Sequence, residues 1–210
     1  MFSLAGKVLD PWSSQTMLST AVPFPPTYVT RDVDLALRFA REHYPVVLKA
    51  VRDDIVHKTD AGAVVLNVQN DDQLLYHFYR LLDRFDSSIL VQKQLKGIEL
   101  FVGGKKDPQF GPVVLFGLGG IFVEVYKDVV ARVAPISLED AREMMDELRG
   151  AAILRGARGT RVDRDAVASL LVRFSEFMAE HPELEEVDLN PVIATQDGAY
   201  AVDARVVLTG

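Results

Sequence analysis

Two segments of the sequence have residue types and spacings suited to chemistry on phosphate groups. The first is His57–Gly62, which reads HKTDAG and follows a short apolar stretch that contains Lys49. A lysine at the end of a strand can reach nucleotide phosphates as a compact point charge. A glycine in the following loop lets backbone N–H groups approach anionic oxygens. His57 could accept a phosphoryl group if its imidazole is neutral and exposed, as the usual pKa of histidine allows at pH 7. An ordinary surface histidine is the alternative interpretation.

The second segment is a hairpin expected at the C-terminal end, around Asp197-Gly198. An Asp-Gly pair favours a two-residue turn, which would place Asn190 opposite Arg205 and Asp203 diagonal to Asn190 on the same face. Diagonal neighbours lie roughly 7–8 Å apart, with their side chains closer. One amide and one carboxylate oxygen, with room for water and phosphate, suit Mg²⁺. A solvated polar face is the alternative interpretation of this hairpin.

A third, weaker signal is the glycine-rich run Gly117-Leu-Gly119-Gly120. It does not fit a dinucleotide-binding fingerprint, because Ile121–Val125 is predicted to be a strand and not a helix. A close backbone turn is the simpler interpretation.

An α+β fold with mixed, largely antiparallel strands is expected to position these residues. Hydrophobic periodicity and capping residues predict four helices: from Thr30 up to Pro45, from Asp71 or Asp72 through Leu82, Ser137–Gly150 and Asp163–Glu180. Short apolar runs predict seven strands: Val46–Ala50, Ala63–Val68, Ser88–Gln94, Ile98–Gly103, Gly111–Phe116, Glu186–Ala194 and Tyr200–Val207. A further hairpin is expected to turn near Lys127–Asp128, and little periodicity is visible in residues 1–20.

Composition narrows the classes of function. The 210 residues include no cysteine, which excludes disulfides, thiolate zinc sites and thioester-forming nucleophiles. The net charge of −7 argues against a nucleic-acid partner, since phosphate neutralisation needs surplus Lys and Arg. No apolar run approaches the ~20 residues that span a bilayer, and no signal peptide is visible. We therefore expect a cytoplasmic protein with no membrane partner.

Taken together, eight segments resemble one family in order and spacing. They are Tyr44–Lys49, His57–Gly62, Leu90–Gln92, Asp107–Pro112, Phe116–Glu124, Leu154–Gly159, Asp188–Pro191 and Val202–Arg205. The sequence resembles the small (beta) subunit, or ATP-grasp domain, of ADP-forming (NDP-forming) acyl-CoA synthetases, a group related to the succinyl-CoA synthetase beta subunit. The resemblance covers residues 22–208.

The resemblance implies an ATP-grasp fold with two lobes. Residues 22–95 would form the N-terminal lobe and residues 96–210 the C-terminal lobe, after a poorly matching N-terminal segment of residues 1–21. The family usually has a second glycine at the position of Ala63, where a side chain would be strained if φ were positive.

The resemblance also implies a function. The family interconverts acid, CoA and ATP with acyl-CoA, ADP and phosphate, and a CoA-binding alpha subunit or domain would bind CoA and the small carboxylic acid. Here His57 would be the phosphohistidine relay, working with ATP or ADP and Mg²⁺. The residues implied in nucleotide binding are Lys49, Lys58, Gly62, Glu99 and the hinge Gln92–Leu95, which includes Lys93; the implied Mg²⁺ ligands are Asn190 and Asp203.

Two other functions are compatible with the sequence. One is a non-catalytic or regulatory ATP-grasp module of a related multi-component protein. The other is a free-standing ligase that forms amide bonds, which the HKTD segment and the lack of further substrate-binding sequence disfavour.

Overall fold

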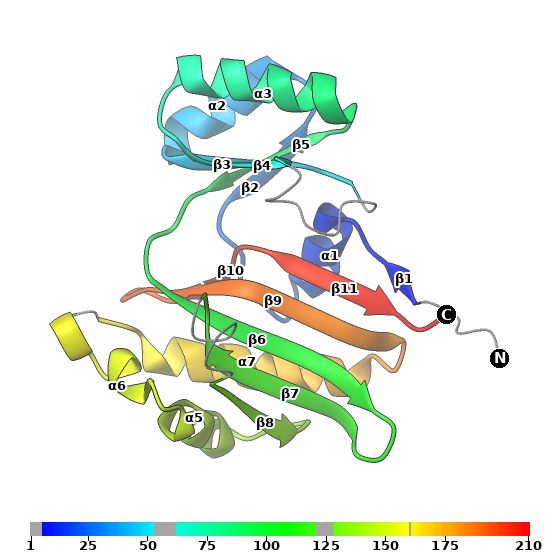
Figure 1. The fold of residues 1–210 in the computed structure, drawn as a ribbon, viewed down its shortest axis with the longest axis vertical. Helices are drawn as coiled ribbons and strands as arrows, with labels where there is room; N and C mark the ends of the chain where they lie inside the picture. The colour runs from blue at the N-terminus through cyan, green and yellow to red at the C-terminus, as the bar shows by residue number, and fades with distance from the viewer. Residues whose placement is uncertain (1–5, 53–61, 121–127, 160) are drawn as a thin grey trace. The chain divides into compact units, whose positions relative to one another are not determined.

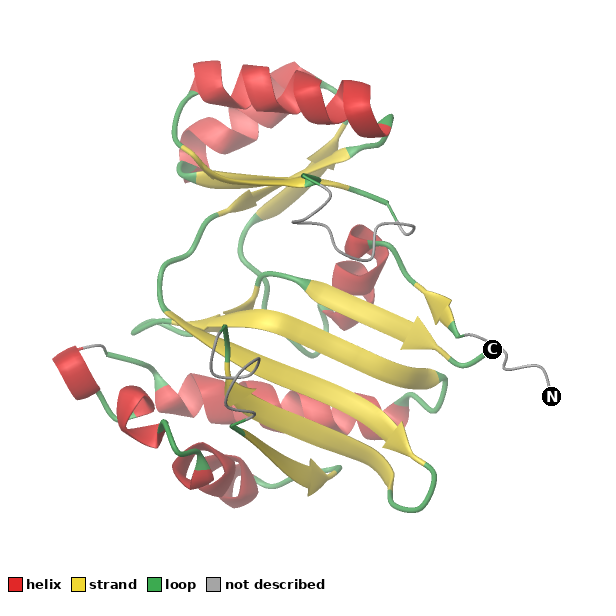
Figure 2. Ribbon diagram, in the orientation of Figure 1, coloured by secondary structure: helices red, strands yellow, loops and turns green. Residues whose placement is uncertain are grey.

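The computed structural model describes residues 6–52, 62–120, 128–159 and 161–210. Figure 1 labels the helices and strands, and Figure 2 colours them by type. The described helices are α1 (Pro11–Leu18), α2 (Val33–His43), α3 (Asp71–Phe85), α5 (Leu138–Glu147), α6 (Ala151–Leu154), η1 (Ala157–Gly159) and α7 (Arg164–Glu180). The described strands are β1 (Lys7–Val8), β2 (Thr27–Thr30), β3 (Val46–Ala50), β4 (Val64–Val68), β5 (Ile89–Lys93), β6 (Ile98–Asp107), β7 (Gly111–Leu118), β8 (Val129–Val133), β9 (Leu184–Ala194), β10 (Ala199–Ala201) and β11 (Ala204–Leu208).

The chain forms two compact units, and the smaller one comprises residues 10–13 and 24–95. Its described strands form an antiparallel sheet in the order β2-β5-β3-β4, with α2 and α3 packed over one face (Figure 1). Successive side chains of a strand point to opposite faces. On β3, Val46 and Leu48 therefore pack into the core beneath the helices, while Lys49 lies on the other face.

Capping and amphipathicity explain both helices of this unit. Asp32 caps α2 by accepting from the N–H groups of Asp34 and Leu35. The predicted caps of α3, Asp71 or Asp72, were wrong: Asn70 is the cap and accepts from Gln73 N. Asn70 has the extended backbone that a capping residue requires, whereas Asp71 is already helical.

The larger unit comprises residues 6–9, 14–23 and 96–210 of the described chain. Its antiparallel sheet has the strand order β1-β11-β9-β6-β7-β8, and β10 also pairs with β9. Helices α5 and α7 contact β6, β7 and β8 and lie together against the sheet in Figure 2. The largest fully buried side chains here include Phe116, Phe174 and Met144.

Helix α5 begins as predicted and ends earlier than predicted. Ser137 and Asp140 form the expected capping box. The helix stops at Glu147 and not at Gly150, because the carboxylate of the buried Asp128 accepts from the N–H groups of Arg149 and Gly150, both at 3.0 Å. These two bonds draw the chain out of the helical path and into α6.

The predicted two-residue turn of the C-terminal hairpin was wrong. Ala194 pairs with Ala199, so four residues, Thr195–Gly198, form the connection. Thr195 N donates to Gly198 O at 2.8 Å, and the hydroxyl of Thr195 donates to the same oxygen at 3.1 Å. The register shifts by two residues, so that Arg205 lies opposite Asp188 and not opposite Asn190.

The remaining observations complete the fold. The expected α+β class with antiparallel sheets is confirmed. Helix α1 was not predicted, since its apolar residues hardly segregate to one face, and β1 pairs with β11 at the edge of the larger sheet. Across the described residues, no helix combines the length and apolar character needed to cross a membrane.

Candidate functional site

Lys49 is held in a chain of hydrogen bonds on the face of the smaller sheet away from α2 and α3. Its Nζ donates to Gln92 Oε1 at 3.2 Å, and Gln92 Nε2 donates to Thr27 Oγ1 at 3.1 Å. Lys49 is only 6% exposed and Gln92 only 1%. A buried ammonium group must be paired, and the hydrogen bond to Gln92 holds the Lys49 Nζ at one place. Thr27 was missed by sequence reasoning, because only the β2–β5 register places it opposite Gln92.

His57 and Lys58 lie outside the described residues. The strands before and after them are joined by a hydrogen bond from Ala50 N to Ala63 O at 2.9 Å. Gly62 has φ +67°, a conformation that glycine adopts freely. The described non-glycine residues with positive φ are Asn67 and Asp86, so Ala63 accommodates its side chain without the strain considered above.

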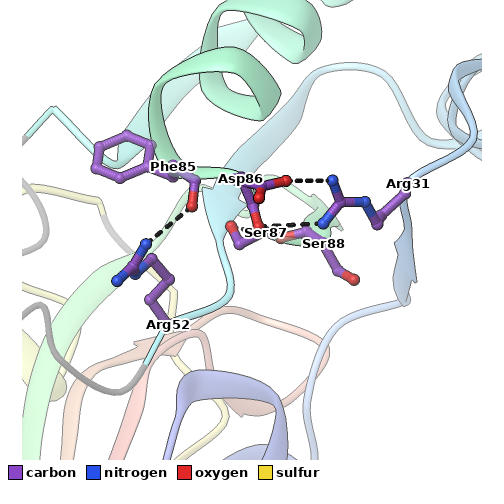
Figure 3. A network of polar contacts seen from close by, with 6 residues as sticks. All are labelled: Arg31, Arg52, Phe85, Asp86, Ser87 and Ser88. Carbon is purple, nitrogen blue, oxygen red and sulfur yellow. Dashed lines mark hydrogen bonds and ion pairs between the residues drawn. The ribbon is translucent and has the colours of Figure 1, made fainter.

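Residues on either side of segment 53–61 lie close to the last turn of α3, and Figure 3 shows the contact that Arg52 makes there. Arg52 Nη1 donates to Phe85 O at 3.0 Å. A Cβ added to Gly62 would lie 3.0 Å from Arg84 Nη1, so that guanidinium group is close to the Gly62 backbone. Arg52 and Gly62, the residues that flank the segment carrying His57, thus both lie near one helix end.

That helix end is itself held by Arg31, the residue that follows β2. Asp86 ends α3 with φ 44°, a left-handed conformation, and Arg31 donates to its carbonyl oxygen at 3.1 Å and to its carboxylate at 2.5 Å (Figure 3). The hydrogen bond from Arg31 holds the pKa of Asp86 below its usual range. The bonds stabilise a helix end that would otherwise leave unpaired carbonyl groups.

The expected nucleotide hinge, Gln92–Leu95, follows a course fixed by proline carbonyls. Lys93 N donates to Pro26 O and Gln94 N to Pro45 O, each at 2.9 Å. The Lys93 side chain is exposed and that of Leu95 is half-buried. The segment thus leaves β5 with a defined backbone path.

Glu99, in the larger unit, lies against the glycine-rich run. Gly119 N donates to Glu99 O at 2.7 Å, and a Cβ at Gly119 would lie 2.9 Å from the Glu99 carbonyl carbon. Gly120 has φ +60°, and a Cβ there would lie 3.5 Å from Glu99 Oε2. The described part of the run therefore allows close backbone approach, as the simpler interpretation held.

Asn190 and Asp203 face each other directly and not diagonally. Leu189 pairs with Ala204, and Val202 N donates to Pro191 O at 3.1 Å, so the two residues between these pairs are adjacent across β9 and the segment before β11. Asn190 is exposed and Asp203 half-buried. The donor set of one amide and one carboxylate oxygen fits Mg²⁺, which usually keeps places for phosphate and water. Among the described residues no group of three or more His, Cys, Asp or Glu could hold a metal ion by itself.

A charged cluster next to this pair was also missed. Arg205 Nη1 lies 2.5 Å from Glu186 Oε1 and 3.2 Å from Asp188 Oδ2. Burial and the neighbouring Glu186 raise the pKa of Asp188, while Arg205 opposes this shift. Arg205 is thus engaged by two carboxylates of β9, and its side chain holds β11 to that strand.

Comparison with known proteins identifies the family. Residues 3–208 match the family model described as ATP-grasp domain. The β subunit of ADP-forming acetate–CoA ligase I from Pyrococcus furiosus is 41% identical over 212 residues, which cover 96% of this chain and 91% of that protein. The chain belongs to the ATP-grasp components of ADP-forming acyl-CoA synthetases.

Two further relatives show how this ATP-grasp component occurs elsewhere. ADP-forming acetate–CoA ligase I of Archaeoglobus fulgidus is 43% identical over 214 residues; the chain corresponds to 31% of that longer protein. Dinucleotide-forming acetyl-coenzyme A synthetase 1 of Ca. Korarchaeum cryptofilum, solved with coenzyme A and Mg-AMPPCP, has its phosphohistidine segment pointing towards the nucleotide binding site. It matches with a TM-score of 0.85 and 37% identity over 97% of this chain and 93% of that one.

The family assignment confirms the expected ATP-grasp fold and the ligase class of this component. The individual site residues stay predictions. The structure places them in two sets, one in each unit. Lys49, Gly62, Gln92, Lys93 and Leu95 belong to the smaller unit, and Glu99, Asn190 and Asp203 to the larger one.

Proposed function

We propose that this chain is the nucleotide-binding subunit of an ADP-forming acyl-CoA synthetase, and that it transfers a phosphoryl group between Mg-bound nucleotide and His57. Lys49 carries the proposal. A lysine ammonium group that is 6% exposed and bonded to a buried glutamine is costly for a fold to maintain. Such a group is suited to neutralising charge that builds up on a transferring phosphoryl group.

In the direction of acyl-CoA synthesis, the bond between the γ-phosphorus of ATP and its bridging oxygen breaks. A bond from that phosphorus to an imidazole nitrogen of His57 forms, and ADP leaves. The neutral imidazole supplies the electron pair for the new bond. Mg²⁺ held by Asn190 and Asp203 would offset the charge of the nucleotide phosphates, and Lys49 would contact the phosphate oxygens.

The phosphoryl group then passes from His57 to a histidine of a CoA-binding alpha subunit and from there to the carboxylic acid, which becomes an acyl phosphate. The CoA thiol takes the acyl group, and phosphate leaves. Two observations on relatives support a separate partner. The P. furiosus relative is a β subunit. The chain corresponds to 31% of the A. fulgidus relative, so the larger part of that protein lies outside the match.

The separation of tasks gives a direct test. The isolated chain should bind Mg-ATP or Mg-ADP in calorimetry and should make no acyl-CoA from acid, CoA and Mg-ATP. Addition of the purified CoA-binding partner should start the formation of acyl-CoA and ADP. Acyl-CoA synthesis by the chain alone would contradict the proposal, and nucleotide binding without turnover in the complete mixture would favour the regulatory alternative.

A further inference from the structure

The larger unit contains a pocket lined by arginines, one of which, Arg155, belongs to the segment Leu154–Gly159 noted in the sequence. Its volume is about 540 Å³, and its charged and polar lining consists of Arg155, Arg161, Arg164, Gln196 and Asp197. The other lining residues are apolar or glycine. Pockets of this size accept small molecules. None of the candidate nucleotide or Mg²⁺ residues lines it.

The guanidinium groups of the pocket are only partly neutralised. Arg164 Nη2 and Arg155 Nη1 share a single oxygen, Asp146 Oδ1, at 2.9 and 3.2 Å. Arg164 Nη1 is buried and has no hydrogen-bond partner among the described residues. Arg161 makes no hydrogen bond or ion pair within the described part of the chain. Arg155 and Arg161 are exposed. The buried Nη1 of Arg164 is costly without an acceptor, so this nitrogen favours a ligand that supplies an oxygen.

The walls of the pocket are held by hydrogen bonds of the protein itself. Asp163 N donates to Thr195 O at 2.8 Å, which joins the segment before α7 to the β9–β10 turn. The Asp163 carboxylate accepts from Ala166 N at 2.9 Å and caps α7. In the turn, Asp197 N donates to Thr195 Oγ1 at 3.1 Å. These bonds fix the backbone that carries the lining residues, which reduces the entropic cost of binding.

We propose that this pocket binds a small multivalent oxyanion, a metabolite that carries phosphoryl or several carboxylate groups. Guanidinium forks match the oxygen spacing of phosphate and carboxylate and can bond both bidentately. The pocket lining has three arginines and a single carboxylate, that of Asp197, although the net charge of the chain is −7. Asp146 Oδ1 bonds to one nitrogen each of Arg155 and Arg164. A ligand with several anionic oxygens can bond to the remaining N–H groups of more than one arginine, and it therefore binds more tightly than a monovalent anion. The pocket would be a second ligand site of the subunit.

Calorimetry of the full chain without nucleotide tests the proposal, with inorganic pyrophosphate as the phosphoryl probe and citrate as the carboxylate probe. At least one should bind at a single site. Replacement of both Arg155 and Arg161 by Gln should weaken binding at least tenfold, while the control Arg142→Gln, an exposed arginine paired with Asp165, should leave it unchanged. Asp197→Asn, at an exposed turn position, should tighten binding severalfold, and this variant tests the pocket even if the double variant folds poorly.

The two probes separate the sources of the oxyanion. Binding of pyrophosphate alone assigns a phosphoryl ligand, and binding of citrate alone assigns a polycarboxylate. Two results would overturn the proposal. One is that neither probe binds at millimolar concentration. The other is that binding is lost in Lys49→Met and unaffected by the Arg155, Arg161 and Asp197 variants.

Discussion

The ammonium group of Lys49 belongs to a buried side chain. Replacement of this residue tests its role in nucleotide binding. Lys49→Met keeps the length of the side chain and removes the ammonium group. We expect Mg-ATP affinity to fall at least tenfold, about 1.4 kcal/mol, and thermal stability to change little, because the lost hydrogen bond to Gln92 Oε1 is offset by no longer burying a charge. Titration calorimetry and thermal unfolding measure the two quantities. Lys105→Met, an exposed lysine of β6, is the matched control; unchanged ATP affinity in Lys49→Met would exclude a role in phosphate binding.

Asp203 gives a second residue-level prediction, because its contribution should depend on the metal. With Mg²⁺ present, Asp203→Ala should bind ATP about tenfold more weakly than the wild type, since one of two protein oxygens for the ion is lost. With EDTA, the two proteins should bind ATP equally. Glu185→Ala, an exposed carboxylate of β9, should match the wild type under both conditions. Equal affinities for wild type and Asp203→Ala in Mg²⁺ would return the hairpin to the solvated-face interpretation.

The residues of the site were accessible to sequence reasoning to different degrees. Asn190 and Asp203 were predicted as neighbours, although the reasoning assumed a two-residue turn; the hydroxyl of Thr195 in fact stabilises a four-residue connection. Thr27 carried no signal of its own, because its contact with Gln92 arises from strand pairing across 65 residues. Polar groups that meet only through tertiary register leave little trace in a local pattern.

At the scale of elements, a pH-dependent contact joins α2 to α3. Asp71, at the start of α3, accepts from Arg41 Nη2 at 2.7 Å and from the Tyr44 hydroxyl at 3.1 Å. The hydrogen bond from Arg41, followed by that from Tyr44, holds the pKa of Asp71 below its usual value of 3.8. A lowered pKa in the folded state adds stability that is present above pH 3.8 and is lost as pH falls below it.

Asp71→Asn should therefore lower the free energy of unfolding at pH 7, and the difference from the wild type should shrink below pH 3.8. Urea unfolding at pH 7 and pH 3 measures both values. Asp83→Asn, an exposed carboxylate of the same helix, is the control and should stay close to the wild type at both pH values. A difference for Asp71→Asn that grows on acidification would show that the assignment of the contact is wrong.

The elements themselves followed the sequence closely where periodicity and capping agree. Strand β3 has the predicted bounds, and α5 begins at the predicted capping box. The misses arose from tertiary contacts. The end of α5 depends on Asp128, which bonds to residues 21 and 22 positions further along the chain. Helix α1 has too little amphipathicity to be predicted. Local patterns specify where an element can begin, while distant side chains decide where some elements end.

At the scale of the whole molecule, the candidate nucleotide and Mg²⁺ residues are divided between the two compact units. The smaller unit supplies Lys49 and the flanks of the His57 segment, and the larger unit supplies Glu99, Asn190 and Asp203. Each set lies on or beside antiparallel strands whose partners fix its backbone, which is the arrangement expected of preorganised sites. In the proposed relay, His57 receives the phosphoryl group from the nucleotide and passes it to the partner protein.

Phosphoryl labelling of His57 tests this central claim most directly. The chain is mixed with its CoA-binding partner, acid, CoA and ATP labelled at the γ-phosphoryl group, and the reaction is stopped under basic conditions. The account predicts label on this chain that is lost in acid and kept in base, as for a phosphorylated imidazole. It also predicts that His57→Asn abolishes both the label and acyl-CoA formation while ATP affinity stays within about twofold, because Lys49 and the Mg²⁺ ligands are untouched. Acyl-CoA formation by His57→Asn at a near wild-type rate would contradict the relay and require direct transfer between nucleotide and partner.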